Sequence, residues 1–386
     1  MKRTTKSSDR LHIAMLGQKR IPSREGGIEV VAYELACRMV QLGHEVTCIN
    51  RSKKHTSKKE LVDTYQGIRI KRVWTYNKKG WAAMTASFFG TIAAAFGKYD
   101  IVHFHAEGTC NTIWLPKLLG KRCIVTIHGL DHQRAKWGRW ASAYIKAGEK
   151  KAVKHADEII VLSESTKQYF KDVYNRETKF IPNGVNVVKK KNAKLIKEKF
   201  GLEPEDYILF IGRLVPEKGI QYLIEAFKGI NTRKKLVITG DAADVPDFAA
   251  KLKQMADDSD KEIIFTGFAQ GDLLAELYSN AYIYVLPSDL EGMPLSLLEA
   301  MSYGNCCVVS DIPECQEVVE DKAVSFKSGD TKDLKNCLQK LCENQEQVDY
   351  YRQQTADFIC NKYNWDKVVM NTLELYKDES NENIDD

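Results

Sequence analysis

Two glutamates flank the expected start of a helix, and their surroundings suit the recognition of a sugar linked to a phosphate. The stretch Ser288–Gly304 follows a strand-like run that ends at Pro287, and it places Glu291 in a loop. Glu299 comes about one and a half turns into a helix that can begin at Pro294, because proline fits the first helical position. The free N–H groups at a helix start attract phosphate, and carboxylates accept hydrogen bonds from hydroxyls, as an acid does with a ribose. Alternatively, one of the two glutamates is an ordinary surface acid and the other is a favourable partner of the helix dipole.

Two cations follow the first strand that we expect in the second half of the chain. Arg213 and Lys218 stand on either side of Pro216 in a strand-to-helix loop. Ligands of open α/β sheets bind beyond the carboxyl ends of strands. An arginine and a lysine at this place can neutralise a pyrophosphate through opposing contacts. The pattern favours this function over a surface salt bridge.

The first half of the chain offers candidates at comparable places. Gly26 and Gly27 precede an expected helix, and glycines let backbone N–H groups approach an oxyanion closely, although a simple tight turn would also use them. His128 ends an expected strand just before a glycine. This position favours a residue of a binding cleft over a histidine of the core.

His103 and His105 alternate with Phe104 in an expected strand, so both histidines lie on one face of it. The two imidazoles alone do not predict a metal site, because no third ligand is evident. Acceptor-site and core roles both remain open for them.

The elements that must position these residues alternate between strands and helices. In the first half, the sequence predicts strands at 12–17, 45–50, 68–75, 100–105, 123–128, 158–163 and 178–182. In the second half, it predicts strands at 207–212, 235–240, 262–267, 282–286, 306–310 and 323–326. Apolar residues at a spacing of three to four predict helices between them, for example over 28–42 and 141–156. The order indicates two doubly wound α/β domains in tandem; the first loop lacks GxGxxG, so a dinucleotide fingerprint is absent.

Length and composition agree with two soluble domains. A chain of 386 residues with 44% hydrophobic residues is expected to form two cores. The ten cysteines include no CxxC pair, and the polar, basic first ten residues do not resemble a secretory signal, so we expect buried free thiols in a reducing cytosol. The longest apolar stretch, 81–97, is shorter than the ~20 residues that span a bilayer. The tail from Thr331 has a helical pattern, and an acidic, disordered end is expected over 378–386.

Charge divides the chain unevenly. Residues 1–185 hold 33 Lys/Arg and 16 Asp/Glu, a balance of +17, whereas residues 186–386 have a balance of −12. A basic half of this kind faces nucleic acid or an acidic membrane surface. The basic stretches 51–59 and 71–79 lie near Trp74, Tyr76 and Trp81, which suits a membrane interface. No nucleic-acid motif accompanies them, and a solvated loop is an equal alternative for 51–59.

Over nearly its whole length the chain resembles the retaining glycosyltransferases of family 4, which have the GT-B fold, use nucleotide sugars and need no metal. The motifs that carry the resemblance are Gly26-Gly27-Ile-Glu29, Thr126-Ile-His128, Ile181-Pro-Asn-Gly184, Gly212-Arg213 with Lys218-Gly219, and Glu291 with seven residues before Glu299. The last two are the most specific. The opening 18–29 also looks like a subgroup linked to bacterial capsule and exopolysaccharide assembly, rhamnosyltransferases among them.

The resemblance implies an architecture of two Rossmann-like doubly wound domains that face each other across a cleft. Residues 1–185 would form the acceptor domain, with the C-terminal helix 365–378 packing back on it. Residues 186–364 would form the nucleotide-sugar donor domain.

The resemblance also assigns roles to residues at matching positions. Arg213 and Lys218 would bind the donor diphosphate, against which Gly26 and Gly27 would pack their backbone. Glu299 would hold the ribose.

The remaining roles concern the reacting sugar and the acceptor. Glu291 would contact the transferred sugar, and His128 would contact the donor sugar or support charge at the reaction centre. His103, His105 and Glu107 would lie on the acceptor side. No metal and no other cofactor is expected.

These roles describe a hexosyltransferase that moves a hexose or deoxyhexose, with retention, from a nucleotide sugar to a growing polysaccharide or lipid-linked saccharide. The basic first half would place it in the cytoplasm, peripherally on the inner face of the cell membrane, with no nucleic acid as a partner. A GT-B nucleotide-sugar epimerase and a catalytically idle GT-B subunit that recruits a partner enzyme are the alternatives.

Overall fold

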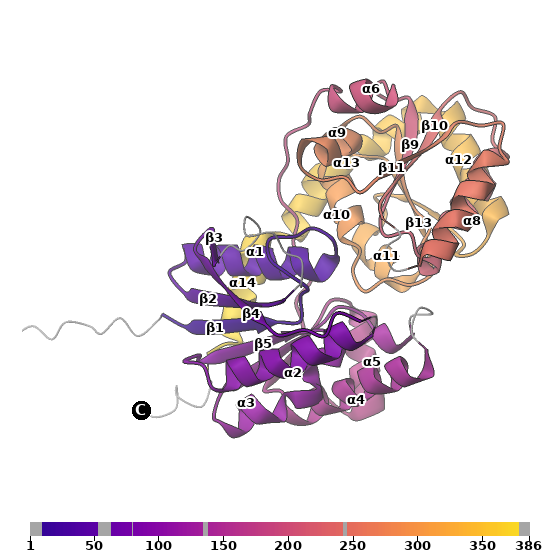
Figure 1. Cartoon of the computed structure of the whole chain (residues 1–386). Coiled ribbons are helices and arrows are strands. Elements are labelled where there is room, and N and C mark those ends of the chain that lie inside the picture. The colour runs from indigo at the N-terminus through magenta and orange to yellow at the C-terminus, as the bar shows by residue number, and fades with distance from the viewer. Residues whose placement is uncertain (1–9, 53–62, 79, 134–137, 242–244, 378–386) are drawn as a thin grey trace, which may run out of the picture. The chain divides into compact units, whose positions relative to one another are not determined.

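The computed structural model describes residues 10–52, 63–78, 80–133, 138–241 and 245–377 (Figure 1). The chain divides into two compact units. The first unit comprises residues 1–183 and 365–386, and the second comprises residues 184–364. The sequence placed the boundary after residue 185, two residues further along.

The first unit contains an eight-stranded sheet in the order β3-β4-β2-β1-β5-β6-β7-β8. Its strands are β1 His12–Leu16, β2 Glu45–Arg51, β3 Thr64–Tyr65, β4 Ile68–Val73, β5 Ile101–His105, β6 Arg122–Ile127, β7 Glu158–Val161 and β8 Lys179–Phe180. All neighbours pair in parallel except β3 and β4. The central strands are buried along nearly their whole length, as expected for a parallel sheet covered on both faces.

Helices cover both faces of this sheet. They are α1 Gly27–Gln41, α2 Trp81–Ala95, α3 Trp114–Leu118, α4 Arg139–His155, α5 Glu164–Tyr174 and α14 Trp365–Glu374. In Figure 1, α1 and α14 lie on one side of the sheet and α2, α3 and α4 on the other. The last helix, α14, packs against α1 and belongs to the first unit, although it ends the described chain.

The second unit contains a six-stranded parallel sheet in the order β11-β10-β9-β12-β13-β14. Its strands are β9 Tyr207–Ile211, β10 Lys235–Thr239, β11 Ile263–Gly267, β12 Ile283–Leu286, β13 Cys307–Ser310 and β14 Val324–Phe326. Its helices are α6 Leu195–Phe200, α7 Ile220–Lys228, α8 Pro246–Asp257, α9 Gly271–Ser279, α10 Leu295–Ser302, α11 Pro313–Val319, α12 Thr331–Glu343 and α13 Gln345–Lys362. The apolar side chains of β9, β10 and β12 form one core with those of α7, α8 and α12.

Every strand predicted from the sequence is present, and most end one or two residues earlier than predicted. The sequence missed β3, which forms a short hairpin with β4. Gln66 and Gly67 connect the two strands, and both have positive φ angles, which suit a tight hairpin turn.

The other general expectations have mixed outcomes. The apolar stretch 81–97 forms α2, and none of the described helices is long and apolar enough to cross a membrane. The helical tail is confirmed by α12, α13 and α14, and all ten cysteines are free thiols. The acidic end 378–386 and most of the basic stretch 51–59 lie outside the described residues.

Candidate functional site

Lys218 and Glu291 meet in the second unit, although 73 residues separate them in the sequence. Lys218 ends a single 3₁₀ turn that follows β9, and Glu291 lies in the loop between β12 and α10. The lysine Nζ lies 2.5 Å from Glu291 Oε1, and both side chains are largely buried. A nearly buried pair with opposite charges at the carboxyl ends of two adjacent strands forms the centre of the candidate site.

Two serines hold the glutamate in place. Ser288 donates a hydrogen bond of 2.7 Å to Glu291 Oε1, and Ser310 donates one of 2.5 Å to the carbonyl oxygen of Ser288. Both serines are completely buried. The Glu291 carboxylate is therefore fixed by side chains from the ends of β12 and β13.

A glycine brings the lysine loop against the glutamate loop. Gly219 has a φ of +66°, and a Cβ atom on it would lie 1.8 Å from the carbonyl oxygen of Pro287. Only glycine permits this conformation and this approach together. From the sequence, Gly219 was recognised only as part of a motif. Its packing role depends on the contact with Pro287, which residue spacing does not reveal.

Arg213 lies in the same loop, directly after Gly212, and is partly buried. A Cβ atom on Gly240, at the end of β10, would lie 1.8 Å from the carbonyl oxygen of Gly212. The backbones at the ends of β9 and β10 are therefore in close contact at Gly212, the residue before Arg213.

Glu299 lies on α10, at the fifth position of that helix. The Oε2 atom of Glu299 accepts a hydrogen bond of 3.2 Å from the hydroxyl of Tyr278, a residue of α9. The predicted start of the helix was wrong by one residue, because Pro294 is extended and precedes the first helical residue, Leu295. The Pro294 carbonyl accepts the first helical hydrogen bonds, so the proline still begins the turn.

Asp289 is a further acid of this loop that the sequence analysis did not single out. Its carboxylate accepts hydrogen bonds from the hydroxyls of Tyr222 and Ser328 at 3.2 Å each. Burial raises the pKa of Asp289 above its ordinary value, and the two hydrogen bonds oppose that shift. Only its place two residues before Glu291 could have suggested it.

In the first unit, Gly26 and Gly27 stand at the start of α1 as predicted. Gly26 is extended and precedes the first helical residue, Gly27. A Cβ atom on Gly26 would lie 2.4 Å from Glu29 Oε2, and Glu29 Oε1 accepts a hydrogen bond of 2.7 Å from the Lys19 backbone. The glutamate thus ties the loop 18–26 to the helix start.

His128 follows β6 and contacts His105 at the end of β5. The His128 Nε2 and His105 Nδ1 atoms lie 3.0 Å apart, so one ring donates and the other accepts. His105 is completely buried, and this burial, with the nearby His128, lowers its pKa well below the ordinary value. His105 is therefore neutral, and its ring contacts the ring of His128.

His103 and His105 lie on one face of β5, as predicted, with their rings stacked at 4.4 Å. His103 is part of the core: its ring nitrogens lie 2.6 Å from the hydroxyl of Tyr376 and 2.7 Å from that of Thr126. Glu107 is also completely buried. Complete burial leaves these three side chains no exposed surface, so the acceptor-side prediction for them gains no support.

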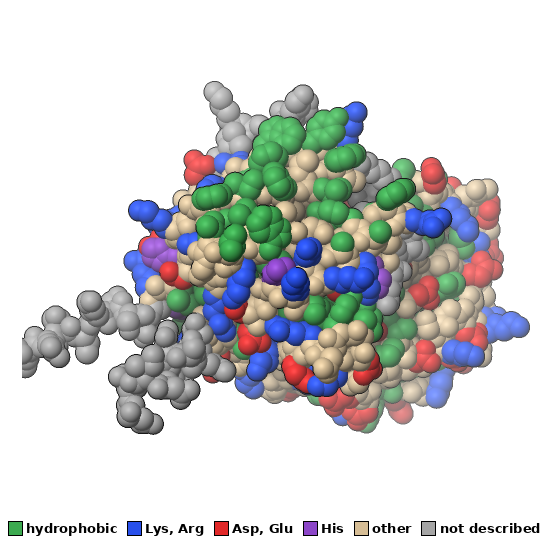
Figure 2. Space-filling view, turned by 90° about the horizontal axis from the view of Figure 1, so that it is seen from below, with side chains coloured by type: hydrophobic (Ala, Val, Ile, Leu, Met, Phe, Trp, Pro, Cys, Tyr) green, Lys and Arg blue, Asp and Glu red, His purple; other side chains and the backbone are tan. Residues whose placement is uncertain are grey.

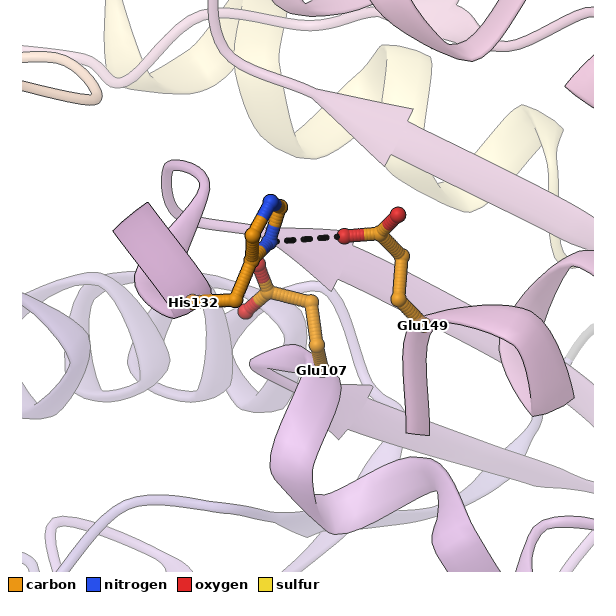
Figure 3. Close-up of side chains that lie close together, drawn as sticks. All are labelled: Glu107, His132 and Glu149. Atoms are coloured by element: carbon orange, nitrogen blue, oxygen red, sulfur yellow. Dashed lines mark ion pairs between the residues drawn. The ribbon is translucent and has the colours of Figure 1, made fainter. Parts of the chain in front are cut away.

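Glu107 instead lies beside two residues that the sequence analysis did not select, His132 and Glu149 (Figure 3). His132 Nδ1 lies 3.2 Å from Glu149 Oε2. Burial, with the nearby carboxylates of Asp131 and Glu149, raises the pKa of Glu107 well above its ordinary value. The three side chains come from separate segments, so no local motif could reveal the cluster.

Two α/β units, each built on a largely or wholly parallel sheet, are the architecture of the GT-B fold. Solved structures with this fold match most of the chain. Sucrose-phosphate synthase from Thermosynechococcus elongatus has a TM-score of 0.78 and 20% identity, with 95% of this chain and 98% of that chain covered. Anabaena HepE in complex with UDP and glucose has a TM-score of 0.77 and 15% identity, with 95% and 99% covered.

Sequence comparisons identify the family. Residues 25–189 match the model described as Glycosyltransferase Family 4, and residues 192–358 match Glycosyl transferases group 1. An uncharacterised glycosyltransferase of Methanocaldococcus jannaschii is 27% identical. The alignment is 395 residues long with its gaps and covers 95% of this chain and 98% of that protein. The Escherichia coli UDP-Gal:alpha-D-GlcNAc-diphosphoundecaprenol alpha-1,3-galactosyltransferase is 30% identical over 300 residues, 73% of this chain and 76% of that protein. The chain belongs to this family of glycosyltransferases.

Proposed function

We propose that this glycosyltransferase moves a hexose or deoxyhexose, with retention of configuration, to a lipid-linked or growing saccharide at the cytoplasmic face of the membrane. The observation that carries the donor half of the proposal is the Lys218–Glu291 pair at the carboxyl ends of β9 and β12. A cation and a carboxylate fixed side by side suit a ligand that has a diphosphate next to a sugar.

Each donor residue has a role in the proposed reaction. Arg213 and Lys218 bind the diphosphate and neutralise the charge that develops as the bond between the anomeric carbon and the diphosphate oxygen breaks. Glu291 accepts hydrogen bonds from the sugar hydroxyls, and Glu299 accepts them from the ribose. The acceptor hydroxyl oxygen bonds to the anomeric carbon, and its proton is released.

The first unit contributes the remaining groups. The backbone of Gly26 and Gly27, free of side chains, approaches the phosphates. His128 contacts the transferred sugar, with His105 holding its ring from behind. In this proposal the diphosphate is met by cations of the chain, and no metal ion is needed for the departure of the nucleoside diphosphate.

An exposed aromatic face supports the membrane part of the proposal. Figure 2, a view from the side on which α2, α3 and α4 lie in Figure 1, shows hydrophobic side chains gathered on the surface with Lys and Arg side chains around them. The aromatic face comprises Trp74, Tyr76, Trp81, Phe88, Phe89, Trp114, Leu118 and Leu119, all exposed. Continuous apolar surface of this kind marks an interaction site.

Ring contacts join Trp74, Tyr76 and Phe89 within the aromatic face. The ring of Trp74 lies 6.3 Å from that of Tyr76 and 5.4 Å from that of Phe89. Lys78 Nζ lies 5.6 Å from the centre of the Tyr76 ring. Exposed tryptophans beside lysines suit the headgroup region of an anionic membrane, because the rings bury apolar area and the cations meet phosphates.

A lipid-linked acceptor agrees with one relative. The Escherichia coli galactosyltransferase acts, by its name, on a sugar linked to diphosphoundecaprenol. An acceptor of that kind holds its diphosphate at the membrane surface, where the basic first half of this chain can meet it. By this proposal the protein works peripherally on the inner face and contributes to capsule or exopolysaccharide assembly, as the resemblance of residues 18–29 to a rhamnosyltransferase subgroup suggests.

The two alternatives are less well supported. Relatives named for their activity include a kanosaminyltransferase, a galactosyltransferase and a mannosyltransferase, which does not favour an epimerase. An idle recruiting subunit would have no need of the donor residues, yet Lys218, Glu291 and Glu299 are all held by hydrogen bonds in one unit.

The experiment begins with a panel of UDP-, GDP- and dTDP-sugars, each tested for thermal stabilisation of the full chain, because a ligand that binds only the folded state raises its melting temperature. The stabilising donor is then incubated with the protein and undecaprenyl-diphosphate-linked N-acetylglucosamine in detergent. Acceptor-dependent release of nucleoside diphosphate and a glycosylated lipid support the proposal. Conversion of the donor without an acceptor would indicate the epimerase, and no change in any donor would indicate the idle subunit.

A further inference from the structure

A group of three potential metal ligands lies in the first unit, outside the residues assigned to sugar transfer. Glu107 belongs to the 3₁₀ helix Glu107–Thr112 after β5, His132 to the 3₁₀ helix Asp131–Gln133 after β6, and Glu149 to α4. Each offers one ligand atom, and these atoms all lie within 4.8 Å of one another. Figure 3 shows the three side chains pointing toward one another.

Only one of the two oxygens of the Glu107 carboxylate has a hydrogen-bond partner. Its Oε1 atom accepts a hydrogen bond of 3.1 Å from the backbone N–H of Asp131. Its Oε2 atom is buried without a hydrogen-bond partner, and the whole residue is inaccessible to solvent. One oxygen thus fixes the side chain, and the other is left for a ligand.

The Glu149 carboxylate follows the same pattern. Its Oε1 atom accepts hydrogen bonds from Tyr169 at 2.9 Å, Tyr174 at 2.5 Å and Lys146 at 2.8 Å. Its Oε2 atom is buried and has no hydrogen-bond partner. The three donors form the outer shell that orients a ligating carboxylate in metal sites.

His132 completes the group. Its Nδ1 atom lies 3.2 Å from Glu149 Oε2, within ion-pair distance but without a hydrogen bond (Figure 3). A neutral imidazole is the form that binds metals.

Glu107 Oε2 is buried without a hydrogen-bond partner, and Glu149 Oε2 and His132 Nδ1 face each other without a hydrogen bond, so a cation at the centre of the three atoms would offset a desolvation cost. Ligands around a tetrahedral ion with bonds of about 2.0 Å lie about 3.3 Å apart. The separation of His132 Nδ1 and Glu149 Oε2 already fits this spacing. Lys146 contacts the other oxygen of Glu149, so it reduces the negative charge of the cluster without occupying its centre.

We propose that Glu107, His132 and Glu149 bind one divalent transition-metal ion, Zn²⁺ or Mn²⁺. Two carboxylates and one imidazole are ligands that these ions accept, whereas the imidazole disfavours Mg²⁺. The ion ties the loop after β6 to α4 and to the end of β5. Since His128 lies four residues before His132 in that loop, the metal positions the His128 backbone and takes no part in the bond changes.

Zn²⁺ binding to the full, untagged chain tests this site directly. After dialysis against EDTA and removal of the chelator, calorimetric titration with Zn²⁺ should show about one ion per chain bound at this site. Glu107→Gln and His132→Gln should each weaken binding at least about tenfold, because even outer-shell losses cost about 10–100-fold. Tyr174→Phe keeps all three ligands but removes one hydrogen bond to Glu149, so about tenfold weaker binding is expected.

Glu177→Gln, which changes an exposed acid of the same unit, is the matched control and should bind like the wild type. Zn²⁺ should also raise the melting temperature of the wild type and of Glu177→Gln, but not of Glu107→Gln. If Glu107→Gln does not fold, His132→Gln gives the same readout. Equal binding by the wild type and by both ligand variants would overturn the proposal. A melting temperature that is the same in EDTA and in Zn²⁺ would also overturn the proposal. In that case a proton shared by the three side chains, and no metal ion, would occupy the cluster.

Discussion

Lys218 Nζ and Glu291 Oε1 lie 2.5 Å apart, at the ends of loops that follow two adjacent strands of the second sheet. Because both side chains are nearly buried, each charge stabilises the other. In the proposed reaction, a nucleotide sugar bound here offers its phosphates to Lys218 and its hydroxyls to Glu291. The ion pair would then hold both side chains in place for the donor.

Gly219→Ala tests whether the close approach of the two loops is required. Alanine at a φ of +66° is strained, and its Cβ would collide with the Pro287 carbonyl, so a loss of about 3–4 kcal/mol in the free energy of unfolding is expected. Gly267→Ala is a matched control in the same unit, with a φ of +71° and no atom within 4 Å of the added Cβ. It should lose only about 1–2 kcal/mol. Urea unfolding measures both; equal losses would show that the loop contact is unimportant.

Glu299→Gln tests the ribose role. Replacing a carboxylate by an amide weakens its hydrogen bonds to hydroxyls by about 1.5–3 kcal/mol. The KM for the donor should therefore rise about 10–100-fold with little change in kcat, because the ribose is bound equally before and during the reaction. Tyr278→Phe, which removes one hydrogen bond to the Glu299 carboxylate, should raise KM less. Glu343→Gln, at the exposed end of α12, should leave both constants unchanged; a fall in kcat alone for Glu299→Gln would contradict the assignment.

The buried His103 predicts a stability that falls in acid. Burial, with the nearby His105, lowers the pKa of His103 well below its ordinary value, so the unfolded chain binds a proton that the folded chain does not. Stability is therefore complete above about pH 6.5 and is lost as the pH falls below it, by about 1.4 kcal/mol per pH unit for this one group. His103→Gln should reduce that slope in urea unfolding between pH 7 and pH 5. An unchanged slope would mean that His103 does not titrate on unfolding.

The aromatic face predicts membrane binding that depends on specific side chains. Trp74→Ser combined with Trp81→Ser removes two large exposed rings, 59% and 56% accessible, and should weaken sedimentation with anionic liposomes at least about tenfold. Tyr350→Ser, which removes an exposed aromatic ring of the second unit, is the control and should bind like the wild type. Sedimentation of all three proteins to the same extent would reject the aromatic face as the contact surface.

The α/β fold could be predicted from the sequence because parallel strands that are buried on both faces form short apolar runs. Glycines and turns separate these runs. The sequence also placed Arg213, Lys218, Glu291 and Glu299 in one unit, since residues that follow strands collect at one edge of a sheet.

Contacts between distant segments could not be predicted in the same way. His103 is a core residue because its ring meets Tyr376, which lies 273 residues further along the chain. The Glu107–His132–Glu149 cluster joins three segments with no shared spacing. The β3 hairpin was missed because two strand residues before a turn give no alternating pattern.

The binding of nucleoside diphosphates by Lys218→Ala tests the central claim most directly. UDP, GDP and dTDP are titrated calorimetrically into the wild type, into Lys218→Ala and into Lys332→Ala, which removes an exposed lysine of the same unit. A diphosphate held by Lys218 loses a charge-assisted hydrogen bond in the first variant, so the diphosphate that the wild type binds should bind about 10–100-fold more weakly. The Lys332→Ala variant should bind it like the wild type. Equal affinity of the wild type and Lys218→Ala for every diphosphate that binds would contradict the account.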